Sequence, residues 1–411
     1  MTTSAPGTVA GRRLAVLTVL LGGLTAFGPL SMDLYLPAFP RLAADLGATQ
    51  AQVQLTLTAD VLGLVAGQLV LGPLSDAWGR RRLLLGSTAL CALASLLCAL
   101  APTVGALTVW RFVQGFAGGG GIVLARAVAA DLTTGVAAAR LFSLFMTLSS
   151  GAPIIAPVIG GALLAWTGDW RVVFHLLAVL NAVLAVAVWR AIPETLPEER
   201  RHRGGLRQTG RAFAALVRDR AFLGYALTVA LAYAALFGYI SGSSFALQQH
   251  YGLSASAFSA VFALNAAGMV LLGLANARLV ARFAVRRLLV LGLSVSAVAA
   301  VVLVLGVTAG AGLGLLAVLP PLFVVITTRG LVASNATVLG VQRGASAAGS
   351  ASAVLGACMF GGGILVTPLV GLGPEGSPVP MALVVAGGAL AALLATVVLT
   401  RSTTEPVAAI R

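Results

Sequence analysis

The sequence predicts an all-α membrane protein with twelve transmembrane helices in two pseudo-symmetric bundles of six. Of the 411 residues, 59% are hydrophobic and only 9% are charged, which is too little charge to cover a soluble protein of this length. Apolar windows of about 20 residues recur along the chain, each long enough to cross a bilayer as a helix. Because the polar segments are short connectors, a large soluble α-helical protein with buried helices is the weaker interpretation.

Twelve spans are expected, with ends placed to within about 2–4 residues. They cover residues 14–38, 50–72, 82–101, 104–126, 138–166, 171–192, 221–246, 255–278, 286–308, 311–334, 346–371 and 380–400. The polar stretch around 190–220 divides them into two sets of six, as in transporters built from parallel repeats. The expected domains are an amino-terminal half of residues 1–192, a cytoplasmic central loop of 193–220 and a carboxy-terminal half of 221–411.

The basic residues predict the orientation. The net charge is +14, and all 26 basic residues are arginines. In a soluble protein this would suggest nucleic acid, but here the arginines cluster in connectors, so no nucleic-acid partner is expected. One set of connectors contains Arg12, Arg13, Arg80, Arg81, Arg82, the arginines of 200–220, Arg278, Arg282, Arg286 and Arg287, whereas the other contains little more than Arg41 and Arg171. The positive-inside rule then places both termini in the cytoplasm.

An acidic residue, Asp33, falls within the first span, in "SMDLYLPAF". It lies about six residues from the outer end of the span, or roughly 9 Å at 1.5 Å per residue. Carboxylates are costly in a bilayer and usually functional there. Pro29 and Pro37 flank Asp33 and weaken the helix around it, which favours a site beside a cavity. The alternative is that the span ends at Leu30 and Asp33 caps it in water.

Two further ionisable residues are expected at a similar depth. Asp60 and Arg111 each lie about seven residues from the outer ends of the second and fourth spans. Burial and a neighbouring arginine act in opposite directions on the proton affinity of a carboxylate. An aspartate–arginine arrangement that opens and closes would therefore switch proton binding. The alternatives are a structural salt bridge or hydrogen bonds for Arg111, and no role in coupling for Asp60.

Two glycine-containing motifs follow the second span and lie within the fifth. In "GPLSDAWGRRR" (residues 72–82), Gly72 permits close helix approach, and Asp76 is placed to cap the next helix or to accept hydrogen bonds from arginines. This cluster could lock the two halves together, or it could only set the topology. A weaker echo, "GLANARLVARFAVRR", follows the eighth span at 273–287. The second motif, "GAPIIAPVIGG" (151–161), bends the span and allows close packing.

No catalytic constellation is found. The sequence contains no lysine, which excludes a phosphate-binding loop ending in Lys-Ser/Thr and therefore ATP hydrolysis of that type. Cys91, Cys98 and Cys358 fall inside apolar spans without metal-ligand spacing. We expect no enzyme activity, no metal and no cofactor, so the energy must come from an ion gradient or from the gradient of the substrate.

These motifs resemble the major facilitator superfamily. "GPLSDAWGRRR" is similar to its loop 2–3 signature, and "WRFVQGFAGGGG" to its span-four motif. "GAPIIAPVIGG" is similar to the span-five motif of drug–proton antiporters. "MDLYLPAFP" and "ARAVAADL" resemble the Bcr/CflA branch of bicyclomycin and chloramphenicol exporters. The resemblance covers essentially the whole chain and implies the major facilitator fold.

The resemblance implies roles by position. Asp33 matches the acidic residue of span one, and Arg111 the span-four arginine linked to proton coupling; Asp60 belongs to no motif. The motif positions are Gly72, Asp76, Gly79, Arg80 and Arg81 for the inner gate, and Gly151, Pro153, Pro157, Gly160 and Gly161 for the antiporter motif. Two positions depart from the family pattern: Ala77 replaces an arginine of the gate, and Ala156 stands where glycine often precedes the proline.

We therefore expect proton-coupled antiport of small amphipathic drugs, phenicols being one case, across a bacterial inner membrane. The partners would be the drug, protons and the bilayer, and the protein would be a monomer. The alternatives are a proton-coupled transporter of an endogenous metabolite, and a channel, for which no pore-lining pattern is visible. The substrate-binding candidates are Tyr35, Gln114, Tyr233, Phe237, Tyr239 and Asn265, with helix packing as the alternative role for the aromatic residues and Asn265.

Overall fold

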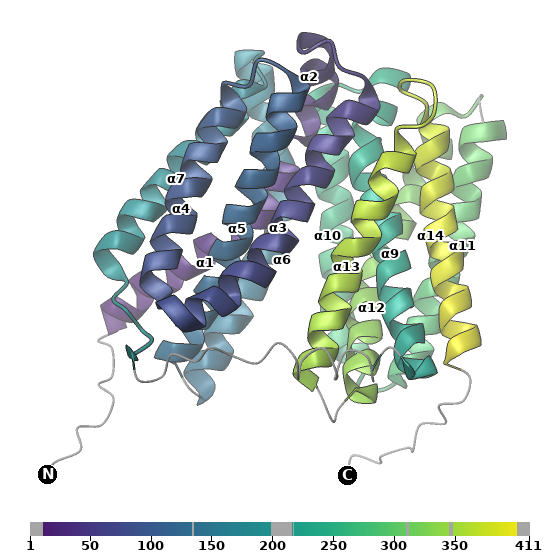
Figure 1. The fold of residues 1–411 in the computed structure, drawn as a ribbon. Helices are drawn as coiled ribbons and strands as arrows, with labels where there is room; N and C mark the ends of the chain where they lie inside the picture. The colour runs from purple at the N-terminus through teal and green to yellow at the C-terminus, as the bar shows by residue number, and fades with distance from the viewer. Residues whose placement is uncertain are drawn as a thin grey trace, which may run out of the picture. The chain divides into compact units, whose positions relative to one another are not determined.

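The computed structural model describes residues 11–133, 135–198, 216, 218–309, 312–344 and 348–400. Regular structure in these ranges is helical, without strands (Figure 1). Most of the expected central loop and both chain ends lie outside the described residues.

Within the described ranges, twelve long helices correspond in order to the twelve expected spans. They are α1 (Gly11–Asp33), α3 (Gln50–Trp78), α4 (Arg80–Ala99), α5 (Val104–Leu132), α6 (Gly135–Thr167), α7 (Arg171–Ala191), α9 (Arg220–Phe245), α10 (Ala255–Leu279), α11 (Val285–Ala309), α12 (Leu319–Arg343), α13 (Ala348–Val370) and α14 (Pro378–Leu399). Short segments join them: η1 (Leu36–Ala38), α2 (Phe39–Asp45), η3 (Ala246–His250) and η4 (Gly314–Ala317). Among the described residues, 11 helices are long and apolar enough to cross a membrane, and α13 adds the shorter apolar stretch Val354–Val370. The prediction of an all-α membrane protein is confirmed.

The first span is broken. The expected single helix over 14–38 ends at Asp33 and is followed by η1 and α2. Pro37 cannot donate a backbone hydrogen bond, and the residue before a proline is disfavoured in the α conformation. The chain therefore leaves the α-helix between Asp33 and Pro37.

The expected end of the tenth span was wrong. The helix α12 runs from Leu319 to Arg343, not over 311–334. Prolines occupy its first turn, where a missing N–H costs nothing. Gly314, at φ +52°, lies in the turn before it. The candidate membrane span runs over Gly314–Arg343, so η4 is part of the span although it lies outside α12, and the span ends later than the expected residue 334.

The described chain forms two compact units. The first comprises Met1–Leu34, Ala59–Ala156 and Asp169–Gly204, and the second comprises Tyr35–Thr58, Pro157–Gly168 and Gly205–Arg411. Residues 35–58 and 157–168, which come from the amino-terminal half of the sequence, group with the carboxy-terminal helices in the second unit. The unit boundary falls directly after α1 and within α3 and α6.

Each unit has its own apolar core. In the first unit, one cluster joins α1, α4, α5, α6 and α7 around side chains such as Leu21, Leu84 and Leu124. In the second, a cluster joins α9, α11, α12, α13 and α14 around Phe222, Leu289 and Ala336.

Glycines bring α3 and α5 into backbone contact within the first unit. A Cβ atom built on Gly115 would lie 2.0 Å from the Asp60 carbonyl oxygen, and one on Gly119 would lie 2.2 Å from that of Leu64. Reciprocally, a Cβ on Gly63 would lie 2.1 Å from the carbonyl oxygen of Phe112. Small residues at this spacing permit the close helix approach common in membrane proteins. The approach fixes the register of the two helices that carry Asp60 and Arg111.

Candidate transport site

A buried ion pair joins α3 and α5. Arg111 Nη2 lies 2.9 Å from Asp60 Oδ2, and both side chains are fully buried. The pair lies one helical turn from Gly115, where the two backbones touch. Sequence depth alone placed both residues at a similar level, and the structure brings them into contact.

Polar and aromatic groups complete the surroundings of Arg111. Its Nη1 donates to Gln114 Oε1 at 2.6 Å, and Gln114 Nε2 donates to Ser95 Oγ of α4 at 2.7 Å. The guanidinium carbon lies 5.6 Å from the centre of the Phe174 ring of α7. Gln114 therefore holds Arg111 in place, and its expected role as a substrate ligand stays a prediction. Four helices meet around this one guanidinium group.

Asp33 is buried at the end of α1, with only 4% of its surface exposed. The alternative that α1 ends at Leu30, with Asp33 as a cap in water, is wrong, since α1 includes Asp33. Within the part of the chain that the structure describes, no basic side chain forms an ion pair with Asp33. Pro29 lies inside the same helix. Asp33 thus combines burial with a break in its helix.

Several of the predicted aromatic and amide ligands contact neighbouring helices. Within the second unit, Asn265 Nδ2 donates to the Tyr239 hydroxyl at 2.9 Å. The Tyr35 hydroxyl lies 3.2 Å from Thr56 Oγ1. A Cβ on Gly363 would lie 2.4 Å from the Phe237 ring, so α13 packs directly on this ring. The role of these residues in substrate binding stays a prediction.

Tyr233 has a charged neighbour that the sequence reasoning missed. The guanidinium carbon of Arg329 lies 4.5 Å from the centre of the Tyr233 ring. The expected tenth span placed Arg329 near a helix end, where an arginine is ordinary, whereas α12 places it well inside the helix. A better limit for this span, set by the Leu-Pro-Pro start, would have identified it.

The segment 35–58 is hydrogen-bonded to α9 and η3 within the second unit. Gln54 Nε2 donates to the carbonyl oxygen of Ser241 at 3.1 Å. Ser244 Oγ donates to that of Leu36 at 2.6 Å, and Gln248 Nε2 to that of Pro37 at 3.1 Å. The broken end of the first span and the start of α3 are therefore tied to the seventh long helix.

The loop 2–3 motif forms a tight helix–turn–helix. Helix α3 continues to Trp78, Gly79 turns at φ +95°, and α4 begins at Arg80. Arg80 Nη1 lies 2.6 Å from Asp76 Oδ1, and Arg80 also contacts Ser75 Oγ. Gly72 lies in α3, where a Cβ would meet the Val123 side chain at 3.4 Å.

The arginines of this motif contact other parts of the first unit. Arg80 Nε lies 3.4 Å from Asp131 Oδ2 of α5. Arg81 donates to the carbonyl oxygens of Trp189 and Ile192, at 2.9 and 2.8 Å. These contacts fasten the α3–α4 turn to α5 and to the end of α7.

Glu194, which sequence reasoning did not single out, caps α4. Its carboxylate accepts hydrogen bonds from the backbone N–H groups of Arg80 and Arg81, at 2.9 and 3.3 Å. These are orphan donors of a helix N-terminus, where a negative charge is favourable. Burial acts to raise the pKa of Glu194, but backbone N–H groups, those of Arg80 and Arg81 among them, outweigh it and hold the pKa below its ordinary value.

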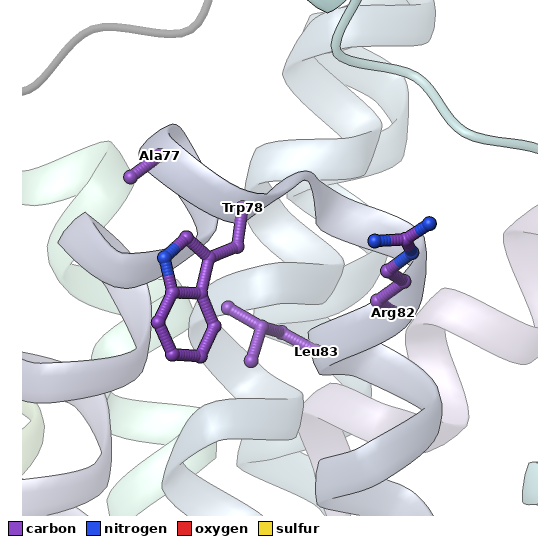
Figure 2. A pocket seen from close by; sticks show the side chains of 4 residues that line it. All are labelled: Ala77, Trp78, Arg82 and Leu83. Atoms are coloured by element: carbon purple, nitrogen blue, oxygen red, sulfur yellow. The ribbon is translucent and has the colours of Figure 1, made fainter.

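A surface hollow of about 400 Å³ adjoins this motif and is lined by Ala77, Trp78, Arg82 and Leu83. Figure 2 shows the Trp78 indole beside Leu83, with the Arg82 side chain apart from both. Tryptophan and arginine together are typical of the membrane–water interface. The hollow therefore fits the edge of the bilayer better than a substrate site.

The antiporter motif lies in α6, across the unit boundary between Ala156 and Pro157. Beyond the boundary, a Cβ on Gly161 would lie 2.3 Å from Ser259 Oγ of α10. At Gly151 a Cβ would meet nothing within 4 Å. Pro153 and Gly160 are helical residues of the same span. Gly161 is therefore one position of close packing in this motif.

The length and apolar composition of the helices define a multi-pass membrane protein. The Major Facilitator Superfamily matches residues 20–368, and the chain belongs to this family. Its relatives include the uncharacterized MFS-type transporter YdgK of Bacillus subtilis, at 38% identity over 90% of this chain and 92% of the relative. The bicyclomycin resistance protein homolog of Haemophilus influenzae is 29% identical over 86% of this chain and 88% of its own length.

Other comparisons add a further relative and show the same fold. A chloramphenicol resistance protein of Pseudomonas aeruginosa is 30% identical over 62% of this chain and 60% of its own length. A crystal structure of a mutant of the nucleoside transporter NupG has a TM-score of 0.73 at 14% identity, over 92% of this chain and 98% of that structure. The resemblance seen in the motifs is thus confirmed at the level of the superfamily and of relatives named for drug resistance.

Proposed function

We propose that this transporter exports small amphipathic drugs across a bacterial inner membrane in exchange for protons. The observation that carries the proposal is Asp33, a buried carboxyl at the break of the first membrane helix. A buried carboxylate is costly, and taking up a proton removes the cost of its charge. Names of relatives that refer to bicyclomycin and chloramphenicol resistance support drugs as the substrate class.

In this proposal Asp33 carries the proton and the Asp60–Arg111 pair controls its surroundings. The broken helix after Asp33 gives water and substrate a route to the carboxyl, since irregular backbone in a membrane usually lines a cavity. Asp60 and Arg111 neutralise each other while they remain 2.9 Å apart. A movement between α3 and α5 that lengthened this contact would leave Arg111 able to stabilise an ionised carboxylate nearby.

The transport cycle would use the two sequence halves, 1–192 and 221–411, as its moving parts. Asp76, Arg80 and Arg81 form the inner gate in this scheme, with their contacts to α5 and to the end of α7 as its anchor. The arginine-rich connectors face the cytoplasm, which places both termini there. The protein acts as a monomer.

The test is drug transport into inside-out vesicles under an imposed pH gradient, with chloramphenicol as the probe. Wild-type protein should accumulate the drug, and a proton uncoupler should abolish accumulation. The same protein should raise drug tolerance in a host that lacks its own efflux pumps. Drug uptake that does not depend on the pH gradient would contradict proton coupling. Absence of transport across a panel of amphipathic drugs would favour an endogenous metabolite as the substrate.

A further inference from the structure

Arg329, in the second unit, is a buried arginine for which the described residues provide no ion pair. Arg329 is 3% exposed, and its Nε and Nη1 atoms have no hydrogen-bond partner among the described residues. It lies about 15 Å along α12 from Leu319 and about 21 Å from Arg343, at 1.5 Å per residue. Arginine side chains usually reach the lipid head groups from near a helix end, and Arg329 lies far from both ends of α12.

The sequence supplies no acid to balance this charge within the carboxy-terminal helices. Between Asp219 and Glu375 the chain contains no aspartate or glutamate. Asp219 pairs with Arg343 instead, at 2.9 Å. An isolated charge at such a depth is costly, and charged residues retained in membrane spans usually mark a substrate or ion pathway.

The neighbours of Arg329 hold it in a fixed direction. The adjacent Gly330 presses α12 onto α10, because a Cβ there would lie 2.3 Å from the carbonyl oxygen of Met269. On the other side, the Arg329 guanidinium covers the ring of Tyr233 in α9, 4.5 Å from its centre. The aromatic face supports the cation without neutralising it. The Nε and Nη1 donors of the Arg329 guanidinium are therefore held in place for a hydrogen-bond acceptor.

We propose that Arg329 and Tyr233 form a binding site for the carboxylate of an amphipathic, monoanionic substrate. This deepens the proposed function and rests on it. A guanidinium binds a carboxylate through two parallel hydrogen bonds, and such charge-assisted pairs are the strong ones. The Tyr233 ring adds an apolar surface for the body of the ligand. Bound carboxylate and Arg329 would neutralise each other in the membrane interior.

The experiment compares one drug skeleton with and without a carboxylate. The probes are the succinate half-ester of chloramphenicol and the methyl ester of that half-ester, bound to purified full-length protein in nanodiscs without any gradient. Wild-type protein should bind the acid at least about tenfold more tightly than its methyl ester, which corresponds to about 1.4 kcal/mol. Equal binding of the two probes overturns the proposal.

Variants locate the preference. In Arg329→Gln, the acid-to-ester affinity ratio should fall to near one, and in Arg329→Lys it should lie between, because lysine keeps the charge but loses the fork. The matched control is Arg282→Gln, which removes one exposed arginine and should leave the ratio unchanged. A ratio that persists in Arg329→Gln, or that falls equally in Arg282→Gln, overturns the site.

The two proposals fail separately. Equilibrium binding of the acid needs no proton gradient, whereas the vesicle assay with neutral chloramphenicol does not involve a carboxylate. If the wild-type protein shows no preference for the acid over the ester but still exports drug in response to the proton gradient, only the proposed anion site is contradicted. If the protein prefers the acid but shows no proton-driven export, only the proposed antiport mechanism is contradicted. If Arg329→Gln does not fold, the affinities of wild-type protein for the acid and the ester still test the proposed carboxylate site.

Discussion

Arg111 Nη2 lies 2.9 Å from Asp60 Oδ2, and neither side chain is exposed. Removing one partner of a buried pair leaves the other charge uncompensated, at a cost of about 3–5 kcal/mol, whereas removing both is far milder. The remainder of the network, Gln114 with Ser95, is neutral and should survive both changes.

We therefore expect Arg111→Gln and Asp60→Asn each to lower the melting temperature of the detergent-solubilised protein strongly. The double variant should melt higher than the worse of the two single variants. Thermal unfolding of all four proteins forms a double-mutant cycle that measures the coupling. Purely additive losses would show that the two charges do not depend on each other.

Gly115→Ala should disrupt the same pair through the backbone. The new Cβ would meet the Asp60 carbonyl oxygen at 2.0 Å, so α3 and α5 must separate. We expect lower thermal stability and lower transport, measured in purified protein and in vesicles. Gly86→Ala on α4 is the matched control, because a Cβ there meets nothing within 4 Å. Wild-type behaviour of Gly115→Ala would mean that the helices tolerate a wider spacing.

Asp33→Asn should abolish uptake driven by a pH gradient while leaving equilibrium drug binding measurable, because the amide cannot carry the coupled proton. Gradient-driven uptake in vesicles and binding in detergent separate the two effects. Asp45→Asn, an exposed acid on α2, should transport like wild type. Wild-type uptake by Asp33→Asn would assign the proton to another group.

The Glu194 cap should make stability depend on pH. Its folded-state pKa lies below the ordinary value of 4.5, so its contribution is fully present above that value and is lost as the pH falls through the folded pKa. Glu194→Gln should therefore lower the melting temperature at pH 7, and the gap to wild type should narrow as the pH falls below 4.5. The exposed Glu375 provides a control as Glu375→Gln. A gap that stays constant with pH would show that the charge of Glu194 does not stabilise the fold.

Much of the fold can be predicted from the length of the hydrophobic segments, because each span must form its backbone hydrogen bonds internally in lipid. Length cannot place a helix end where the apolar stretch continues beyond the helix, and so the residues before Leu319 were assigned to the tenth helix and Arg329 was overlooked. The proximity of Asp60 and Arg111 could be predicted from the sequence, because both lie at a similar distance from the outer ends of their spans. The capping of α4 by Glu194 was not, because the two are far apart in sequence and only the folded α4–α7 packing joins them.

The assignment of residues 35–58 and 157–168 to the second compact unit bears on how the chain can be divided. A fragment that begins after the 193–220 stretch carries α9 to α14 but lacks the partners of Ser241, Ser244 and Ser259. Expressed alone, it would leave part of its surface uncovered. Supplied together with a fragment ending before that stretch, it regains those partners. The protein should therefore tolerate a cut in its backbone there only when both pieces are made in the same cell.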